Sequence, residues 1–189
     1  MPHPLLFRKA ERADAPIMAA HILLAMEDIL SAFIGERSPE EAYHFMLGLV
    51  EAEGNQYSYE NGWVAVAGHE VVASAIVYDG ARLHELRAPV KARVRSLFNR
   101  AFEPEEETRA GEHYIDCAGV SPGHQGQGIG SLLFRFLIGE YAIQGNCTLG
   151  LLVDRENPRA KRLYLDLGFV PVGEQVLAGK HMEHLQYRK

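Results

Sequence analysis

Apolar residues recur at helical spacing over much of the first half of the chain. Asp14-Ala15-Pro16 predicts the start of a helix, with Asp14 as its N-cap. A capping box at Ser38-Pro39-Glu40-Glu41 predicts the start of a second helix. A third apolar stripe continues past Pro89, which is a candidate break because proline lacks the amide hydrogen. The helices expected here span 15–35, 39–52 and 82–102.

Shorter apolar runs bounded by turn residues predict strands, and the turn Ala67-Gly68-His69-Glu70 joins two of them as a hairpin. From residue 113 onward, strands alternate with helices, which indicates a βαβ unit, and the earlier hairpin makes the sheet mixed. We therefore expect one α/β domain over residues 1–189. The strands expected span 5–8, 63–66, 71–78, 113–120, 148–153, 169–177 and 181–187, and the helices among the later ones span 131–143 and 158–167.

The net charge of −6 argues against a general nucleic-acid binder. The charges are unevenly spread, since residues 1–120 carry 11 basic and 19 acidic side chains, whereas residues 121–189 carry 8 and 6. A polyanionic ligand is therefore expected near the C-terminal part, and a cationic one near the remainder. We interpret the acidic run Glu103–Glu107 as a solvated loop.

The two cysteines, Cys117 and Cys147, lie close to apolar residues such as Ala118 and Leu149 and are interpreted as reduced, largely buried thiols, which favours the cytoplasm. Charged residues interrupt the first twelve positions, and no stretch reaches the ~18 apolar residues of a membrane span. We expect neither export nor membrane insertion. No pair among the nine histidines has the spacing of a zinc site, so no metal is expected.

A glycine-dense loop between a predicted strand and a predicted helix is the most informative segment. Glycines at 126, 128 and 130 remove three Cβ atoms where the loop enters the helix, so backbone N–H groups can close around an anionic oxygen. This indicates a pyrophosphate cradle. A Walker A loop needs a lysine before Ser131, and the dinucleotide fingerprint needs a third glycine at a spacing that this loop lacks.

Two sequence blocks carry a resemblance to a known family. Gln125-x-x-Gly128-x-Gly130 follows a strand that ends in Ala118-Gly119-Val120. The second block, Leu149 to Phe169, has Asn157, Ala160, a Leu-Tyr pair and a Gly-Phe pair in order. Together they resemble the acyl-CoA signature of the GNAT acetyltransferase superfamily, closely over about residues 112–170.

The resemblance implies an α/β GNAT fold: a mixed, mostly antiparallel sheet of six to seven strands, helices on both faces, and a V-shaped opening between the central parallel strands. It also implies acetyl-CoA as co-substrate and a splay of the strand near Gly119-Val120, whose freed backbone would pair with the pantetheine. The N–H of Val120 is a candidate oxyanion donor. The residues expected to bind the co-substrate are Ala118, Gly119, Val120, Gln125, Gly126, Gln127, Gly128, Ile129, Gly130, Ser131, Asn157 and Tyr164.

Acetyl transfer to an amine needs proton traffic, because an alkyl amine with a pKa of ~10 arrives protonated and the leaving thiolate must gain a proton. The family places a general acid at the position of Tyr164, although the ring could instead pack beneath the cofactor. A carboxylate on the strand before the loop is the expected base, with Asp116 first and Glu112 second. Asp116 could also pair with an arginine or with the substrate cation, and Asn157 could cap its helix.

Alternation along this strand places Glu112, Tyr114 and Asp116 on one face, with His113 and Cys117 on the other. The function implied is N-acetyl transfer to a primary amine by direct attack in a ternary complex. The alternative is a non-catalytic acyl-CoA-binding sensor with the same fold. The acceptor, a small molecule or a protein amine, stays open. Dimers are common in the family, which leaves a homodimer open, but the sequence identifies no interface.

Overall fold

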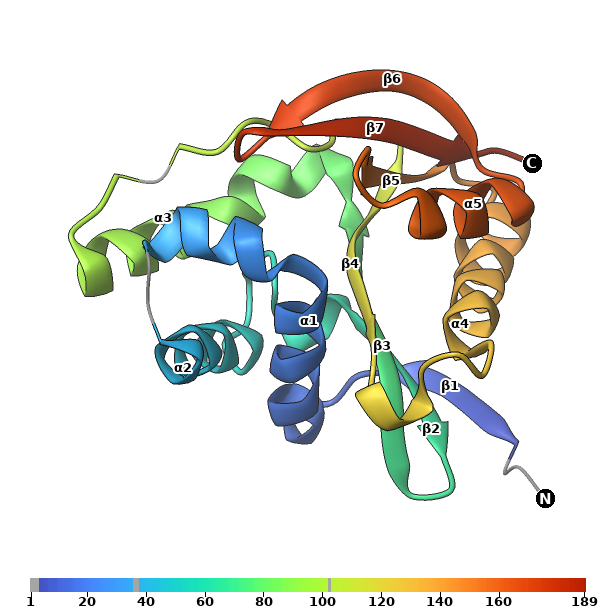
Figure 1. The fold of residues 1–189 in the computed structure, drawn as a ribbon, viewed down its shortest axis with the longest axis horizontal. Coiled ribbons are helices and arrows are strands. Elements are labelled where there is room, and N and C mark those ends of the chain that lie inside the picture. Colours follow the sequence, from blue (N-terminus) through green and yellow to red (C-terminus); the bar gives the residue numbers. More distant parts are fainter. Residues whose placement is uncertain (1–3, 36–37, 102) are drawn as a thin grey trace.

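The computed structural model describes residues 4–35, 38–101 and 103–189 and contains an open seven-stranded sheet with the strand order β1-β2-β3-β4-β5-β7-β6 (Figure 1). Neighbouring strands are antiparallel except β4 and β5, which run parallel. This confirms the mixed, mostly antiparallel sheet. The strands are β1 (Leu5–Lys9), β2 (Gly62–Ala67), β3 (Glu70–Asp79), β4 (His113–Val120), β5 (Leu149–Asp154), β6 (Val170–Leu177) and β7 (Lys180–Tyr187).

Helices cover both faces of the sheet, as expected. Figure 1 shows α1, α2 and α3 on one side and α4 and α5 on the other. The helices are α1 (Ala15–Ile34), α2 (Pro39–Val50), α3 (Leu83–Phe98), α4 (Ile129–Leu137), which continues as the π-helix η5 (Ile138–Gln144), and α5 (Pro158–Asp166). Short 3₁₀ turns lie at η1 (Arg12–Asp14), η2 (Tyr59–Asn61), η3 (Gly80–Arg82) and η4 (Pro122–His124). No helix within the described ranges combines the length and apolarity needed to cross a membrane.

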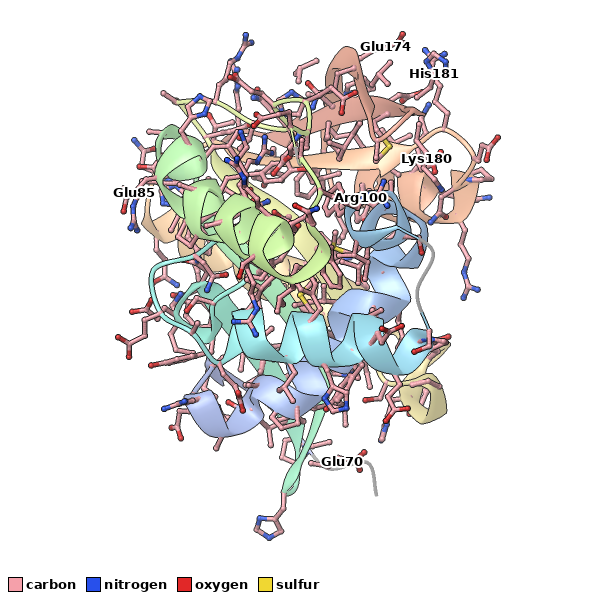
Figure 2. The ribbon with its side chains drawn as sticks, turned by 90° about the vertical axis from the view of Figure 1, so that its left-hand side faces the viewer. Glu70, Glu85, Arg100, Glu174, Lys180 and His181 are labelled. Carbon is pink, nitrogen blue, oxygen red and sulfur yellow. The ribbon has the colours of Figure 1, made fainter. Side chains whose placement is uncertain are left out.

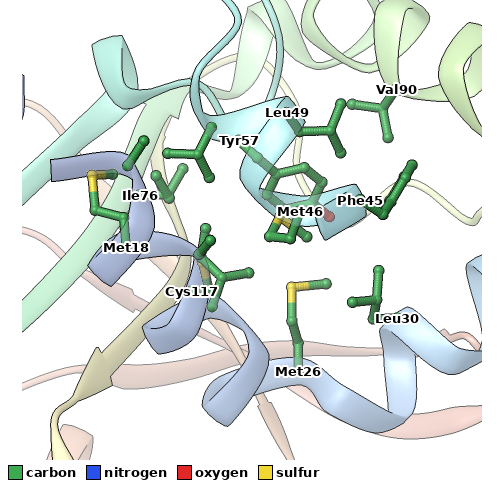
Figure 3. Close-up of a cluster of buried hydrophobic side chains, with 14 of the residues drawn as sticks. Met18, Met26, Leu30, Phe45, Met46, Leu49, Tyr57, Ile76, Val90 and Cys117 are labelled. Carbon is green, nitrogen blue, oxygen red and sulfur yellow. The ribbon is translucent and has the colours of Figure 1, made fainter. Parts of the chain in front are cut away.

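Each face of the sheet has its own apolar core. The first core lies under α1, α2 and α3, and Figure 3 shows part of it, with Met18, Leu30 and Met46 around Tyr57 and Cys117. The second core lies under α4 and α5 and includes Leu133 and Phe169, both almost fully buried. Fully burying one such side chain stabilises the fold by about 1.5–3 kcal/mol.

The helix starts differ in how they are capped. The Ser38 capping box is confirmed, because the Ser38 hydroxyl accepts from the Glu41 amide at 3.1 Å and Glu41 Oε2 accepts from the Ser38 amide at 3.2 Å. Asp14 is the N-cap residue of α1, as expected, but its side chain makes no capping hydrogen bond to the helix. Its carboxylate accepts instead from the Arg8 guanidinium and, at 2.8 Å, from the Glu11 amide. The salt bridge to β1 replaces the cap.

Two helices depart from the predicted boundaries. The candidate break at Pro89 was wrong, because α3 runs through it and keeps Leu86 and Val90 buried, which compensates for one missing hydrogen bond. The helix ends at Phe98, with Asn99 left-handed at φ 50°, and the expected end at 102 lies outside the described residues. α4 begins at Ile129, two residues earlier than expected.

A π-helix and a cysteine lie at the far end of α4. The widened turn of η5 brings the hydroxyl of Tyr141 to 2.9 Å from Trp63 Nε1, which donates to it, so a tertiary contact accompanies the irregular geometry. Cys147 follows and is half-buried, so the expectation that both thiols are largely buried holds for Cys117 alone. Both cysteines are free thiols, as expected.

β4 contains a β-bulge at Asp116. Cys117 is opposite Ile76 and Ile115 is opposite Val77, so Asp116 is the extra residue. The predicted face of Cys117 was therefore wrong, because the bulge places Cys117 in the same core as Tyr114. His113 does lie on the other side, where its ring is 4.9 Å from that of Tyr141.

The pairing between β4 and β5 ends soon after it begins. The register joins residues 113–115 to residues 149–151 and stops at the pair Ile115 and Leu151. The two strands therefore diverge from Asp116 onward, which is the V-shaped opening that the resemblance implies. The opening begins three residues before Gly119, where the sequence placed it. Gly119 and Val120 lie inside the unpaired stretch.

α1 is fixed closely against β4. A Cβ atom at Gly119 would overlap the backbone carbonyl oxygen of His21, so only glycine permits this approach. The buried His21 ring lies between two hydroxyls, with Nδ1 3.0 Å from Ser74 Oγ and Nε2 2.8 Å from Ser121 Oγ. Burial lowers the pKa of His21 to about 4, so the ring is neutral near pH 7. The contacts lock the helix beside the opened edge of β4.

Candidate active site

A cavity of about 700 Å³ lies where β4 and β5 separate. β4 contributes Asp116 and Ala118 to its wall, and the second half of α1 contributes Met26 and Phe33. α1 is kinked at Met26, whose backbone angles of φ −143° and ψ 31° are not helical, and Figure 3 shows Met26 near Cys117. The strand opening and the kink thus create one cavity between α1 and the sheet.

Two carboxylates share the same hydrogen-bond donors at the inner wall of the cavity. The Gln56 side-chain amide nitrogen donates to Glu107 Oε1 at 2.6 Å and to Asp116 Oδ2 at 2.6 Å. The Tyr78 hydroxyl lies 3.1 Å from Glu107 Oε1 and 2.9 Å from Asp116 Oδ2, and its single proton serves one of them at a time. We call Glu107 and Asp116 the carboxylate pair.

Arg87 of α3 holds the loop that carries Glu107. Its guanidinium forms a salt bridge to Glu107 Oε2, and both side chains are almost fully buried, at 5% and 6% exposure. The same guanidinium donates to the carbonyl oxygens of Pro104 at 3.2 Å and Glu105 at 3.1 Å. One buried cation therefore orders the acidic run and turns its last carboxylate inward. The interpretation of this run as a solvated loop was wrong for Glu107, although residues 103, 105 and 106 are exposed.

Gln56, which donates to both members of the carboxylate pair, lies in the loop after α2. The buried Asn55 side chain donates to the carbonyls of Leu49 and Ala52, both at 2.8 Å, and accepts from the Tyr57 amide at 3.0 Å. These bonds close the loop on itself and direct Gln56 and Tyr57 to the cavity wall. The Asn55 side chain thus fixes the turn that presents Gln56 to the carboxylate pair.

The environment of Asp116 makes its carboxyl a much weaker acid. Burial raises the pKa of Asp116, and the negative charge of Glu107 raises it further, to about 7. Hydrogen bonds from Gln56 and Tyr78 and the charge of Arg87 act in the opposite direction. A carboxyl that titrates near neutral pH beside a cavity can accept and return a proton.

Tyr164 reaches the same cavity from α5. Its ring packs against Phe134, with ring centroids 4.9 Å apart, and against Phe169 at 6.1 Å. Burial raises the pKa of the phenol to about 12, so the group keeps its proton at neutral pH and can donate it. Asn157 also lines the cavity, and its side chain caps α5 by accepting from the Ala160 amide at 3.0 Å.

Glu112 lies outside the cavity lining. Its buried carboxylate accepts from Thr108 Oγ1 at 2.7 Å and from Gln186 Nε2 at 2.7 Å, and it lies 2.9 Å from His184 Nε2. Burial raises the pKa of Glu112, but the bonds from His184, Thr108 and Gln186 outweigh it and lower the pKa below its ordinary value. Glu112 thus joins β4 to β7 as a charged structural group.

The glycine-dense loop is open at the surface. Gly126 and Gly128 have positive φ angles of 76° and 79°, and a Cβ atom at either would meet nothing within 4 Å. The loop leads into α4, whose first amides have no intrahelical acceptor by helix geometry. The open space, the positive helix end and the exposed amides fit a pyrophosphate group.

The edge of β4 that faces the opening continues this surface. Ser121 donates its amide to Val72 of β3 at 2.9 Å, and successive N–H groups of a strand point to opposite sides. The N–H of Val120 therefore points away from β3, toward the opening. The carbonyl of the same residue accepts from Gln125 Nε2 at 3.1 Å, which ties the loop to the strand.

Several basic side chains on and near α5 form ion pairs within the chain. Arg155 forms an ion pair with Glu174 of β6, and Lys161 forms one with Glu183 of β7 at 2.8 Å. Lys180 lies 3.1 Å from Asp154 at the rim of the cavity, and Figure 2 labels it near His181 on the β6–β7 hairpin. Of these residues, Asp154 and Lys180 line the cavity. The described residues contain no cluster of three or more His, Cys, Asp or Glu side chains suited to a metal ion.

The structure brings Asp116, Ala118, Asn157 and Tyr164 together in one cavity and places the glycine loop beside the same strand. Sequence reasoning missed Glu107 and Gln56. Glu107 is the only member of its acidic run that is buried, and nothing in the local pattern distinguishes it from its neighbours. Gln56 is 60 positions from Asp116, so only the tertiary structure reveals the contact.

Comparisons with known proteins agree with this geometry. The model of the acetyltransferase (GNAT) family matches residues 23–169. A crystal structure of an acetyltransferase is 28% identical, with a TM-score of 0.80 over 97% of this chain and 98% of that one. An N-acetyltransferase from Staphylococcus aureus Mu50 is 18% identical, with a TM-score of 0.78 over 96% and 100%.

A third solved structure, of histone acetyltransferase HPA2 and related acetyltransferase from Corynebacterium glutamicum ATCC 13032, is 22% identical, with a TM-score of 0.71 over 100% of this chain and 97% of that one. The last two likenesses concern the fold alone. A search of curated proteins found no match.

Proposed function

From the premise that this chain belongs to the acetyltransferase (GNAT) family, and is therefore an acyltransferase, we propose that it transfers the acetyl group of acetyl-CoA to a primary amine. The observation that carries the proposal is the pairing of a proton acceptor and a proton donor in one cavity at the opened edge of β4. Asp116 titrates near neutral pH, and Tyr164 keeps its proton. Acetyl-CoA supplies the activated thioester.

The chain offers a continuous surface for acetyl-CoA. The amides of Gln127, Gly128, Ile129 and Gly130 hold the pyrophosphate at the start of α4, where the helix dipole adds about half a positive charge. Residues 118–120 pair with the pantetheine through backbone groups that β5 leaves free. Asn157 and Tyr164 face the same channel from α5.

Three groups of the chain then act on the reacting atoms. Asp116 takes the proton from the acceptor ammonium, which frees the nitrogen lone pair for direct attack. The N–H of Val120 donates to the carbonyl oxygen of the thioester, where negative charge develops. As the C–N bond forms and the C–S bond breaks, Tyr164 donates its phenolic proton to the departing sulfur, and the second proton of the attacking nitrogen restores the phenol. Glu112 is not assigned to this step, because its carboxylate is engaged by three partners outside the cavity.

The carboxylate pair also favours a cationic acceptor. An ammonium group that enters the cavity meets Asp116 and Glu107 on the same wall, while the apolar side chains of α1 face it from the other side. Coulomb attraction in a partly desolvated site is stronger than in water, so a primary amine is bound in its charged form and deprotonated there.

A thiol-release assay with acetyl-CoA and a panel of primary amines tests the function. The panel should contain alkyl amines, polyamines, amino acids and peptides with a free N-terminus or lysine. Calorimetry with acetyl-CoA alone runs alongside. We expect heat with acetyl-CoA, and release of coenzyme A above hydrolysis with at least one amine. Binding without release for every amine class would overturn N-acetyl transfer, and the absence of binding would overturn the acetyl-CoA site as well.

A further inference from the structure

We propose that Glu107 is a positioning residue for the base, a second carboxylate that orients Asp116 through the donors they share and whose negative charge strengthens the hold of Asp116 on a proton. This inference rests on the proposed function, because it assigns Asp116 as the group that accepts the proton of the acceptor amine. Glu107 itself is paired with the Arg87 guanidinium and does not take that proton.

The geometry gives each carboxylate a different task. Glu107 has the buried guanidinium of Arg87 on Oε2 and forms an ion pair with it. Asp116 has only neutral donors within the described residues, the Gln56 amide at 2.6 Å and the Tyr78 hydroxyl at 2.9 Å. Because the same two donors also contact Glu107 Oε1, the two carboxylates are held side by side. Like charges at such separation favour a proton on the member without a cation.

Several hydrogen bonds hold the loop that carries Glu107, and with it the carboxylate pair, in place. Arg87 fixes the loop through two backbone carbonyls, and the carbonyl of Glu107 accepts from the Gln175 side chain of β6 at 3.1 Å. The bulge in β4 turns Asp116 toward this loop. Two elements far apart in sequence thus place one carboxylate against the other.

Several titratable or charged groups surround Asp116. They come from the loop after α2, from β3, from α3, from the loop before β4 and from β4 itself. They are Tyr57, Tyr78, Arg87, Glu107, Tyr114 and Cys117. Burial raises the pKa of Tyr57, Tyr78, Tyr114 and Cys117 well above their ordinary values, so these four stay neutral near pH 7. Glu107 and Arg87 are left as an ion pair.

The step itself is a simple proton transfer. The N–H bond of the acceptor ammonium breaks, an O–H bond forms on Asp116, and the electron pair stays on nitrogen. A carboxylate that binds the proton more tightly receives it more readily from an amine, which is why the neighbouring negative charge favours the reaction.

The test compares two conservative variants with opposite expected effects. Glu107→Gln removes the negative charge, so the titration midpoint of Asp116 should move down by about one pH unit. Tyr78→Phe removes a donor that stabilises the ionised form, so the midpoint should move up. The two readouts are the NMR titration of ¹³C-labelled aspartate carboxyls and the midpoint of the acidic limb in the pH profile of kcat/KM. Each variant should move both readouts in its own direction.

Two further variants serve as controls. Glu106→Gln makes the same charge change one position away, on an exposed side chain paired with His84 at 3.2 Å. It should leave the acidic limb of the kcat/KM profile unchanged. Glu107→Gln leaves Arg87 buried without its partner, which can impair folding. The double variant Arg87→Met with Glu107→Gln removes both charges. It should still move the midpoint down, by less than the single variant.

The outcomes separate this inference from the proposed function. If the wild-type protein acetylates amines but Glu107→Gln, alone or with Arg87→Met, leaves the acidic limb unchanged, the inference is overturned and the function stands. Shifts of Glu107→Gln and Tyr78→Phe in the same direction would also overturn it. If no amine is acetylated while the NMR midpoint moves as expected, the function is overturned and the coupling of the two carboxyls is supported.

Discussion

Replacing Tyr164 by phenylalanine removes one hydroxyl from the cavity and leaves the ring. The ring packs against Phe134 and Phe169, and in the described part of the chain the hydroxyl has no hydrogen-bond partner. Phenylalanine therefore fits the same space, and the free energy of unfolding should change by no more than about 0.5 kcal/mol. A defect in this variant then reports chemistry rather than folding.

The size of that defect follows from the state of the phenol. With a pKa of about 12, Tyr164 is protonated in all but about one molecule in ten thousand at pH 8. It is therefore ready to donate a proton to the departing sulfur. General acid catalysis contributes about 10²–10⁴-fold, so kcat should fall by that factor, which corresponds to about 2.7–5.5 kcal/mol of barrier.

The assay is thiol release at saturating acetyl-CoA, with the dissociation constant of acetyl-CoA measured by calorimetry. We expect kcat to fall while the dissociation constant changes by less than about threefold, because the ring still lines the channel. Tyr187→Phe is the matched control: its ring packs on Phe169 at 5.8 Å but lies outside the cavity lining. An unchanged kcat in Tyr164→Phe, or an equal loss in the control, would refute the role of this phenol.

The remaining predictions concern the base and two structural contacts. Asp116→Asn should lower kcat/KM by about 10²–10⁴-fold near pH 7, and the deficit should narrow as the pH approaches the amine pKa of ~10; a constant deficit across the pH profile would contradict its role. Gly119→Ala should destabilise the fold by about 1–3 kcal/mol in urea unfolding, because the new Cβ overlaps the carbonyl oxygen of His21, whereas Gly123→Ala, with open space around it, should change stability by less than about 0.5 kcal/mol. The pKa of Glu112 is lower in the folded chain than its ordinary 4.5, so its contribution to stability is present above about pH 4.5 and is lost as the pH falls through the folded value. Urea unfolding of Glu112→Gln should accordingly show a flatter dependence on pH than the wild-type protein below about pH 4.5, and parallel curves would argue against this contribution.

Patterns confined to neighbouring residues predicted the local structure well. The capping box at Ser38 is present as expected, and the apolar runs bounded by turn residues located the strands to within a residue or two. The glycine loop does enter a helix, and the two sequence blocks led to the family that the chain belongs to. The local interpretations failed where a distant partner intervened, as at Asp14, whose carboxylate binds Arg8 of β1.

The residues of the candidate site also differ in whether the sequence could reveal them. Tyr164 was a candidate from the sequence because it belongs to the Leu-Tyr pair of the second block, and Asp116 because it lies on the strand before the glycine loop. Glu107 was not, because its burial depends on Arg87, a residue 20 positions away on another element. The bulge at Asp116 also escaped prediction, since strand alternation gives no sign of an extra residue.

The amino-acid order alone was enough to specify the helices, the strands, the glycine-dense turn and the family, because these depend on spacings of a few residues. Chain folding was needed to set where β4 leaves β5, which face Cys117 occupies, and which acid of the run Glu103–Glu107 enters the cavity. The physical reason is that burial and charge pairing are properties of neighbours in space. The proton affinity of Asp116 is raised by burial and by the charge of Glu107 and is opposed by hydrogen bonds from Gln56 and Tyr78, groups that only the folded chain brings together.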